Sequence, residues 1–174
     1  MPGSQSQSSS AGAPLREPID VPTRETAEFL ATRLAPRSTL IEVGCGAGFL
    51  TAALAQRGLR VDAVDASEGM VDATRGRIAT LGLADVATAR VADVHALEVV
   101  DGTYAAVVAL GVLPWLHSPG AGLREIARIL APGGAVILTG NNRARLNFVL
   151  DPRYNPLLAF PLKRRAKAVL KRLG

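Results

Sequence analysis

The sequence lacks the features of secreted and membrane proteins. It contains one cysteine in 174 residues, so an internal disulfide is excluded and nothing indicates an oxidising compartment. No apolar run is long enough to cross a bilayer, and no basic stretch followed by an apolar run marks a signal peptide. These absences predict a cytoplasmic protein.

Histidine and aromatic residues are also scarce. The two histidines and the single cysteine lie far apart in the sequence, so we predict no metal site. Aromatic residues make up 4% of the chain and apolar residues 48%, which is typical of a globular domain with a core of small aliphatic side chains. The length is sufficient for one domain with a substantial core.

Positive charge is concentrated in one part of the chain. From Asn141 onward there are nine Lys or Arg residues and one acidic residue, so the rest of the chain has a net negative charge. We therefore expect no nucleic-acid binding by the domain. The basic part includes an amphipathic helix over 162–173, which can pack on the domain, lie peripherally on an anionic membrane, or dock an acidic partner.

Composition divides the chain into three parts. Residues 1–20 are rich in Ser, Gln, Gly and Pro, which predicts a disordered tail. Residues 21–142 form the predicted domain, and residues 143–174 form a basic, proline-containing C-terminal segment.

Within the domain, short apolar runs alternate with segments of helical periodicity. The runs predict strands at 39–43, 60–65, 86–91, 104–110 and 135–139. The periodic segments predict helices at 23–34, with Thr23 as the N-cap, at 49–57, at 67–81, and around 123–130 before a Pro132-Gly133-Gly134 turn. This alternation predicts an α/β fold of the doubly wound, Rossmann-like type, with a mostly parallel sheet of at least five strands. Asp62, in the middle of its strand, is expected at the solvent edge.

A glycine-rich turn follows the first predicted strand, in the sequence Glu42-Val43-Gly44-Cys45-Gly46-Ala47-Gly48. Glycines at such a turn let the backbone approach a ligand, although the same pattern also occurs in tight packing turns. The dinucleotide pattern G-x-G-x-x-G requires glycine at position 49, where this chain has Phe49. The observed pattern is instead E-x-G-x-G-x-G. Asp65 closes the second strand, where an acid can accept hydrogen bonds from both ribose hydroxyls of a nucleotide.

Further segments follow in a recognisable order: Ala66-Ser67-Glu68-Gly69-Met70, Ala92-Asp93-Val94, and the helix that precedes Pro132-Gly133-Gly134. Together with the glycine turn and Asp65, they resemble the class I methyltransferases, and especially the broad family that methylates small molecules. The resemblance covers about residues 22–142.

The resemblance implies S-adenosylmethionine as the cofactor. It implies that Asp65 holds the ribose, that Met70 covers the adenine, and that Asp93 meets the adenine amino group. The cofactor-binding residues that it implies are Glu42, Gly44, Cys45, Gly46, Gly48, Asp65, Ala66, Met70, Asp93, Val94 and Leu110. For two of these residues a purely structural role is the alternative, since Met70 also fits a core stripe and Asp93 can cap a turn.

The loop Gly111-Val112-Leu113-Pro114-Trp115-Leu116-His117 follows the fourth strand and is expected to face the methyl donor. Its apolar character favours an uncharged, bulky acceptor. His117 is the best-placed candidate for a general base, although a surface loop histidine is the commoner case; His95 and Tyr154 are weaker candidates.

The two final strands of the class I methyltransferase fold are not recognisable after residue 140. We therefore expect an S-adenosylmethionine-dependent methyltransferase that acts on a small molecule, at O, N or C, with a complementing chain or a second copy completing the fold. A non-catalytic cofactor-binding or scaffold subunit is one alternative. A nicotinamide-dependent oxidoreductase is another, which Phe49 disfavours.

Overall fold

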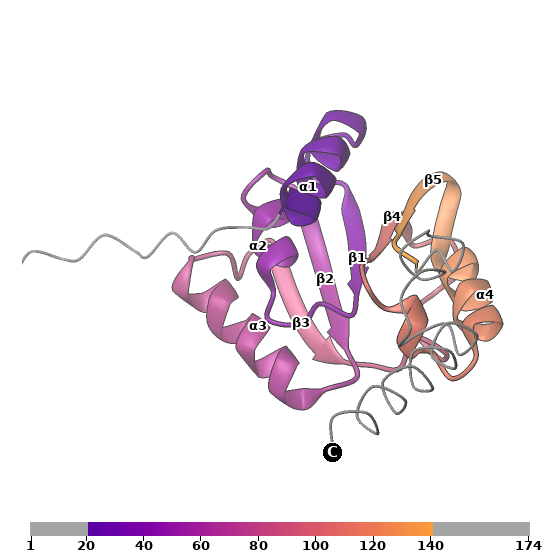
Figure 1. Cartoon of the computed structure of the whole chain (residues 1–174). Coiled ribbons are helices and arrows are strands. Elements are labelled where there is room, and N and C mark those ends of the chain that lie inside the picture. The colour runs from indigo at the N-terminus through magenta and orange to yellow at the C-terminus, as the bar shows by residue number, and fades with distance from the viewer. Residues whose placement is uncertain (1–20, 141–174) are drawn as a thin grey trace, which may run out of the picture.

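The computed structural model describes residues 21–140 of the chain (Figure 1). The predicted N-terminal tail and the basic C-terminal segment with its amphipathic helix lie outside the described residues. Among residues 21–140, no helix combines the length and the apolar character needed to span a bilayer. In chain order the elements are α1 (Val21–Arg33), β1 (Thr39–Val43), α2 (Phe49–Ala55), β2 (Arg60–Asp65), α3 (Glu68–Thr80), β3 (Ala87–Val91), β4 (Tyr104–Ala109), η1 (Leu113–Trp115), α4 (Pro119–Ile129) and β5 (Leu130–Leu138).

The five strands form one sheet in the order β3-β2-β1-β4-β5, and every pair of neighbours is parallel. The chain moves outward from β1 to β3 on one side and then returns to place β4 on the other side of β1. The strand order therefore reverses between β1 and β4. In open α/β sheets, ligands bind at such a switch point, beyond the carboxyl ends of the strands.

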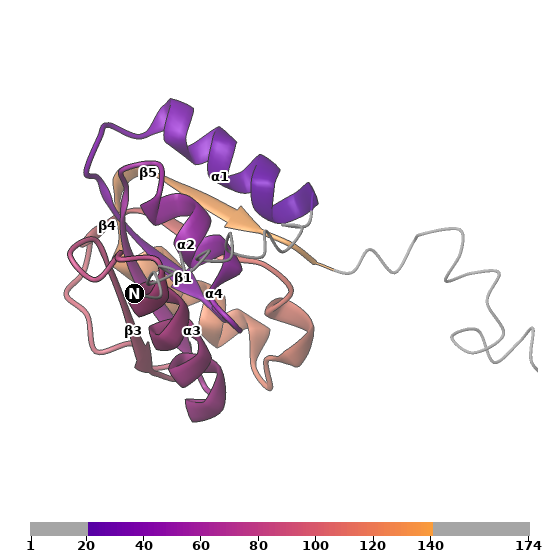
Figure 2. The ribbon, with the colours of Figure 1, turned by 90° about the vertical axis from the view of Figure 1, so that its left-hand side faces the viewer.

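Each face of the sheet has its own hydrophobic core. On one face Leu40 and Val61 pack against apolar side chains of α1, α2 and α3, including Leu30 and Leu54. On the other face the core continues to Ile126 and Ile129 of α4. Figure 2 shows α1, α2 and α3 together on one side of the sheet, with α4 on the other. The predicted doubly wound α/β fold is confirmed.

The segment between β3 and β4 contains no helix and is fixed by side chains of α4. Arg128 donates to the backbone oxygens of Leu97 at 2.9 Å and Val99 at 2.7 Å. Glu125 accepts from the N–H of Leu97 at 2.9 Å. An arginine carries five N–H donors, so one side chain of α4 can satisfy several carbonyls of an irregular segment.

The predicted boundaries of β1 and β2 agree with the structure, and most others differ by at most two residues. The Thr23 N-cap prediction is wrong, because α1 begins at Val21 and Thr23 lies inside the helix. α4 begins four residues before the predicted start, with Pro119 in its first turn. Proline suits that position because the N–H it lacks would have no partner there.

The prediction for β5 is also wrong at its start. The strand begins at Leu130, directly after α4, and Pro132-Gly133-Gly134 lies within it. Tyr104 pairs with Leu130 while Ala106 pairs with Ala135, so the residues between them bulge out of the register. Gly133, at φ 77°, provides the left-handed backbone that the bulge requires.

The sequence had indicated that Asp62 lies at the solvent edge, and the structure shows instead that its side chain is hydrogen-bonded between strands. Its carboxylate accepts from the Tyr104 hydroxyl at 2.7 Å and from the Thr88 hydroxyl at 3.0 Å. Burial raises the pKa of Tyr104, so its hydroxyl remains a donor at neutral pH. Asp62 thereby connects β2 to β3 and β4.

Candidate functional site

A pocket of about 630 Å³ opens at the carboxyl ends of the strands, at the switch point. Its walls come from the residues that end or follow four strands and from the loop after β4. The lining residues are Val43, Gly44, Val64, Asp65, Ala66, Val91, Ala92, Asp93, Val94, His95, Leu110, Gly111, Val112, Trp115, Leu116 and His117. Pockets of this size hold cofactors and drug-sized ligands.

The glycine turn reaches the pocket at Gly44 and has a backbone that only glycine adopts easily. Gly44, Gly46 and Gly48 have φ angles of 72°, 53° and 76°. A side chain at Gly44 would strike Val112, and one at Gly48 would strike Thr74. A Cβ at Gly46 would meet no protein atom within 4 Å, so this face of the turn is open to a ligand.

Thr74 of α3 stabilises the glycine turn through a hydrogen bond. Its hydroxyl donates to the carbonyl of Gly46 at 2.8 Å, and the Cys45 sulfur lies 3.5 Å from the same hydroxyl. Burial raises the pKa of the Cys45 thiol to about 11, so it stays protonated and is no nucleophile at neutral pH. The sequence pattern predicted the helix that carries Thr74 but not this contact.

Glu42 is buried behind the turn and does not line the pocket. The Thr51 hydroxyl of α2 donates to its carboxyl at 2.5 Å. Burial raises the pKa of Glu42 to about 8, and the neighbouring Asp65 contributes to the increase. The side chain is therefore mostly protonated at neutral pH and connects β1 to α2.

Asp65 lies at the end of β2, with its carboxylate in the pocket wall. One oxygen accepts from the N–H of Gly46 at 3.0 Å, and the other accepts from the N–H of Ser67 at 2.9 Å. A carboxylate has about four acceptor positions, so both oxygens keep capacity for ligand hydroxyls.

Two histidines meet beside Asp93, at the other side of the pocket. The N–H and the ring Nδ1 of His95 lie 2.9 Å and 2.6 Å from the same Asp93 oxygen. These hydrogen bonds lower the pKa of Asp93. The His95 ring contacts the His117 ring, with the centroids 3.9 Å apart. Because Nδ1 of His95 faces a carboxylate and its Nε2 is buried without a protein partner, His117 is the more accessible imidazole.

The structure brings seven of the predicted site residues together in the pocket wall, namely Gly44, Asp65, Ala66, Asp93, Val94, Leu110 and His117. Glu42, Cys45, Gly46, Gly48 and Met70 are not among the lining residues. The alternative prediction that Met70 lies in the hydrophobic core is wrong, since this side chain is 46% exposed. The apolar lining residues Val43, Val64 and Val91 were missed because strand-ending valines carry no signal that separates a pocket wall from a core. Within residues 21–140, no group of ligating side chains is arranged to hold a metal ion.

Comparison with known proteins identifies the class to which this site belongs. A family model described as "Methyltransferase domain" matches residues 41–138, more than half of the chain. A ubiquinone biosynthesis O-methyltransferase from Caulobacter sp. (strain K31) is 34% identical over 104 residues, which cover 60% of this chain and 41% of that protein. The chain thus spans less than half the length of the curated relatives that it matches.

Solved structures show the same architecture. A Methanococcus maripaludis protein assigned as an S-adenosyl-L-methionine-dependent methyltransferase has a TM-score of 0.63 at 25% identity, over 88% of this chain and 77% of that one. A geranyl diphosphate methyltransferase solved with S-adenosylmethionine has a TM-score of 0.58 at 28% identity, over 66% and 48% of the two chains. The chain belongs to the methyltransferase domain family, as the resemblance of its sequence motifs had indicated.

The buried carboxyl of Glu42 generates a prediction about pH. Its pKa is raised from 4.5 to about 8 in the folded protein, so its stabilising contribution is complete below pH 4.5 and is lost as the pH rises towards 8. Glu42→Gln keeps the shape without the charge. We expect the variant to gain stability over the wild type progressively between pH 5 and pH 8, by on the order of a few kcal/mol, and the difference to level off above pH 8.

Thermal unfolding across this pH range measures the effect, with the exposed Glu98→Gln as the matched control. A difference between Glu42→Gln and the wild type that does not change with pH would contradict the protonated, buried state of Glu42.

Proposed function

We propose that this domain binds S-adenosylmethionine in the pocket at the switch point and transfers its methyl group to a hydroxyl group of a small molecule. The observation that carries the proposal is the charge of the pocket combined with its open glycine turn. Two carboxylates, Asp65 and Asp93, line it, and no Lys or Arg is among the lining residues. This charge suits a sulfonium cofactor, and Phe49 in place of the third glycine of the dinucleotide pattern disfavours a nicotinamide dinucleotide.

The residues present fit the cofactor. The open face of Gly46 allows close approach, and Asp65 can accept from ribose hydroxyls in addition to its two backbone donors. His95 fixes one oxygen of Asp93, which leaves the other for the adenine amino group. Ala66, Val94 and Leu110 supply apolar surface in the same wall. When bound, S-adenosylmethionine supplies an activated methyl group, so the protein mainly positions the acceptor and excludes water.

An oxygen acceptor is supported by His117. Its imidazole is exposed in the pocket wall, where it can take the proton of an acceptor hydroxyl. The curated relatives are named as O-methyltransferases, which is consistent with this chemistry. The apolar walls formed by Val112 and Leu116 favour a small, uncharged acceptor.

We also propose that a further segment of polypeptide covers the edge of β5. In the described residues β5 pairs only with β4, and Val136 is 40% exposed. A groove of about 430 Å³ separates β5 from α1 and is lined by Glu25, Thr26, Phe29, Val136, Ile137 and Leu138. An uncovered edge strand beside an apolar groove is a surface for pairing. The cover can come from residues beyond 140, from a second copy, or from another protein.

The first test concerns the cofactor. S-adenosylhomocysteine should raise the melting temperature of the protein and NAD should not, because a ligand that binds only the native state stabilises it. Asp65→Ala should weaken the binding of S-adenosylhomocysteine by on the order of 1–3 kcal/mol through the loss of hydrogen bonds. Asp85→Asn, at an exposed position outside the pocket, is the control. Stabilisation by NAD alone, or unchanged affinity in Asp65→Ala, would refute the assignment of the site.

The second test concerns the proton. His117→Gln should lower kcat by about 100-fold, within the usual range for the loss of a general base, and change the pH–rate profile. Binding of S-adenosylhomocysteine should be unchanged. A pH–rate profile identical to that of the wild type would show that the acceptor loses its proton without His117.

The third test concerns the edge of β5. If the groove docks further polypeptide, Val136→Lys should abolish self-association or binding of an added partner in sedimentation velocity, because a charge then lies on the pairing surface. Val100→Lys, in an exposed loop before β4, should have no effect. We expect methyl transfer by the isolated chain to be slow and to increase with the cover in place.

A stable monomer with full turnover alone would contradict a cover supplied by a second copy or by another protein. A completed assembly that binds S-adenosylhomocysteine but never transfers a methyl group would instead identify a non-catalytic cofactor-binding subunit.

A further inference from the structure

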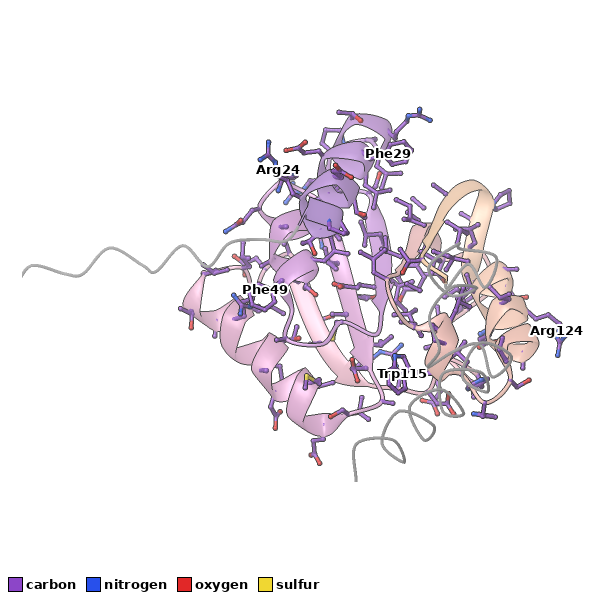
Figure 3. All side chains as sticks on the ribbon, in the orientation of Figure 1. Arg24, Phe29, Phe49, Trp115 and Arg124 are labelled. Atoms are coloured by element: carbon purple, nitrogen blue, oxygen red, sulfur yellow. The ribbon has the colours of Figure 1, made fainter. Side chains whose placement is uncertain are left out.

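We infer that Trp115 is the platform on which the acceptor stacks, and that the acceptor is a flat, uncharged aromatic molecule with a hydroxyl group. The inference rests on the proposed function and deepens it. Trp115 is the single tryptophan of the chain, lines the pocket and is nevertheless 86% exposed. Figure 3 shows it beyond the carboxyl ends of the strands, at the level of the pocket rather than in either core.

The exposure of this side chain does not result from a loose loop. On one side of Trp115, Val112 is in direct contact with Gly44 and fills the space that a side chain there would take. On the other side, a methyl group of Leu116 lies 2.8 Å from where a Cβ of Gly122 would be. His117 contacts His95, as described above. The N–H of Trp115 itself donates to the carbonyl of Val112 at 2.9 Å.

Val112 and Leu116 therefore pack inward, whereas the indole of Trp115 is exposed. A large apolar ring that a packed loop carries in the wall of a pocket, and that is left uncovered, is suited to contact with a ligand. The adjoining walls of Leu110, Val112 and Leu116 add apolar surface on the same side.

The surroundings of Trp115 define the chemical class of the acceptor. An indole prefers a flat aromatic partner, which it can meet by offset stacking or edge to face. Asp65 and Asp93 line the pocket without a lysine or arginine, so a carboxylate or phosphate on the acceptor would be repelled. His117 lies two residues after Trp115 on the same fixed loop, where an acceptor hydroxyl can reach its ring.

The single tryptophan makes the test direct. The full chain, saturated with S-adenosylhomocysteine, is titrated with catechol, with its saturated counterpart cyclohexane-1,2-diol, and with the anionic 3,4-dihydroxybenzoate. Binding is measured by calorimetry and by quenching of tryptophan fluorescence. We expect catechol to quench the fluorescence and to bind at least 10-fold tighter than either of the other two compounds.

Three variants separate stacking from other effects. Trp115→Ala should weaken catechol binding at least 10-fold, Trp115→Phe should restore most of it, and the exposed Val100→Ala should behave as the wild type. With a methylated catechol as product, Trp115→Ala should raise KM and leave kcat within a few-fold. The affinity for S-adenosylhomocysteine should be the same in all variants.

Equal binding of catechol and cyclohexane-1,2-diol, or of catechol by the wild type and Trp115→Ala, would overturn the inference. A loss of affinity for S-adenosylhomocysteine in Trp115→Ala would overturn it too, by showing that the indole contacts the cofactor. A concentration-dependent blue shift of the emission without ligand would show that another protein chain covers Trp115. A wild type that binds catechol but not S-adenosylhomocysteine would contradict the proposed cofactor while leaving the aromatic site standing.

Discussion

The carboxylate of Asp65 holds together the two turns on which the rest of the pocket depends. It accepts from the turn after β1, at Gly46, and from the start of α3, at Ser67. Hydrogen bonds to a charged acceptor are stronger than neutral ones, so a single side chain can fix two backbone segments that would otherwise lack partners. Because Asp65 also lines the pocket, the shape of the glycine turn and the polar character of this wall depend on the same side chain.

The other half of the pocket depends on α4 in the same way. Among residues 21–140 this is the only helix in the core on its face of the sheet, and Arg128 uses its donors to fix the irregular segment that leads from β3 to β4. Gly122, on the same helix, leaves the space into which Leu116 packs. α4 therefore sets the position of both the Asp93 turn and the loop that carries Trp115, although neither belongs to the helix.

Most of the fold and part of the site follow from sequence because of one geometric rule. Parallel strands place their carboxyl ends at one edge, so residues such as Gly44, Asp65 and Asp93, each found just after an apolar run, line the same pocket. The contact between His95 and His117 could not be predicted, since it depends on the path of a loop and on α4. The bulge in β5 could not be predicted either, because it arises from pairing with β4 and not from the local sequence.

The two halves of the pocket meet at Gly44. Val112 occupies the space that a side chain of residue 44 would fill, so the loop that carries Trp115 and His117 rests directly on the glycine turn. A closely packed contact of this kind transmits a displacement, because interiors have no slack to absorb it. A ligand that fixes the glycine turn therefore also fixes the backbone at Gly44, against which Val112 packs. The absence of a side chain at Gly44 thus allows the loop that carries Trp115 and His117 to pack directly on the glycine turn.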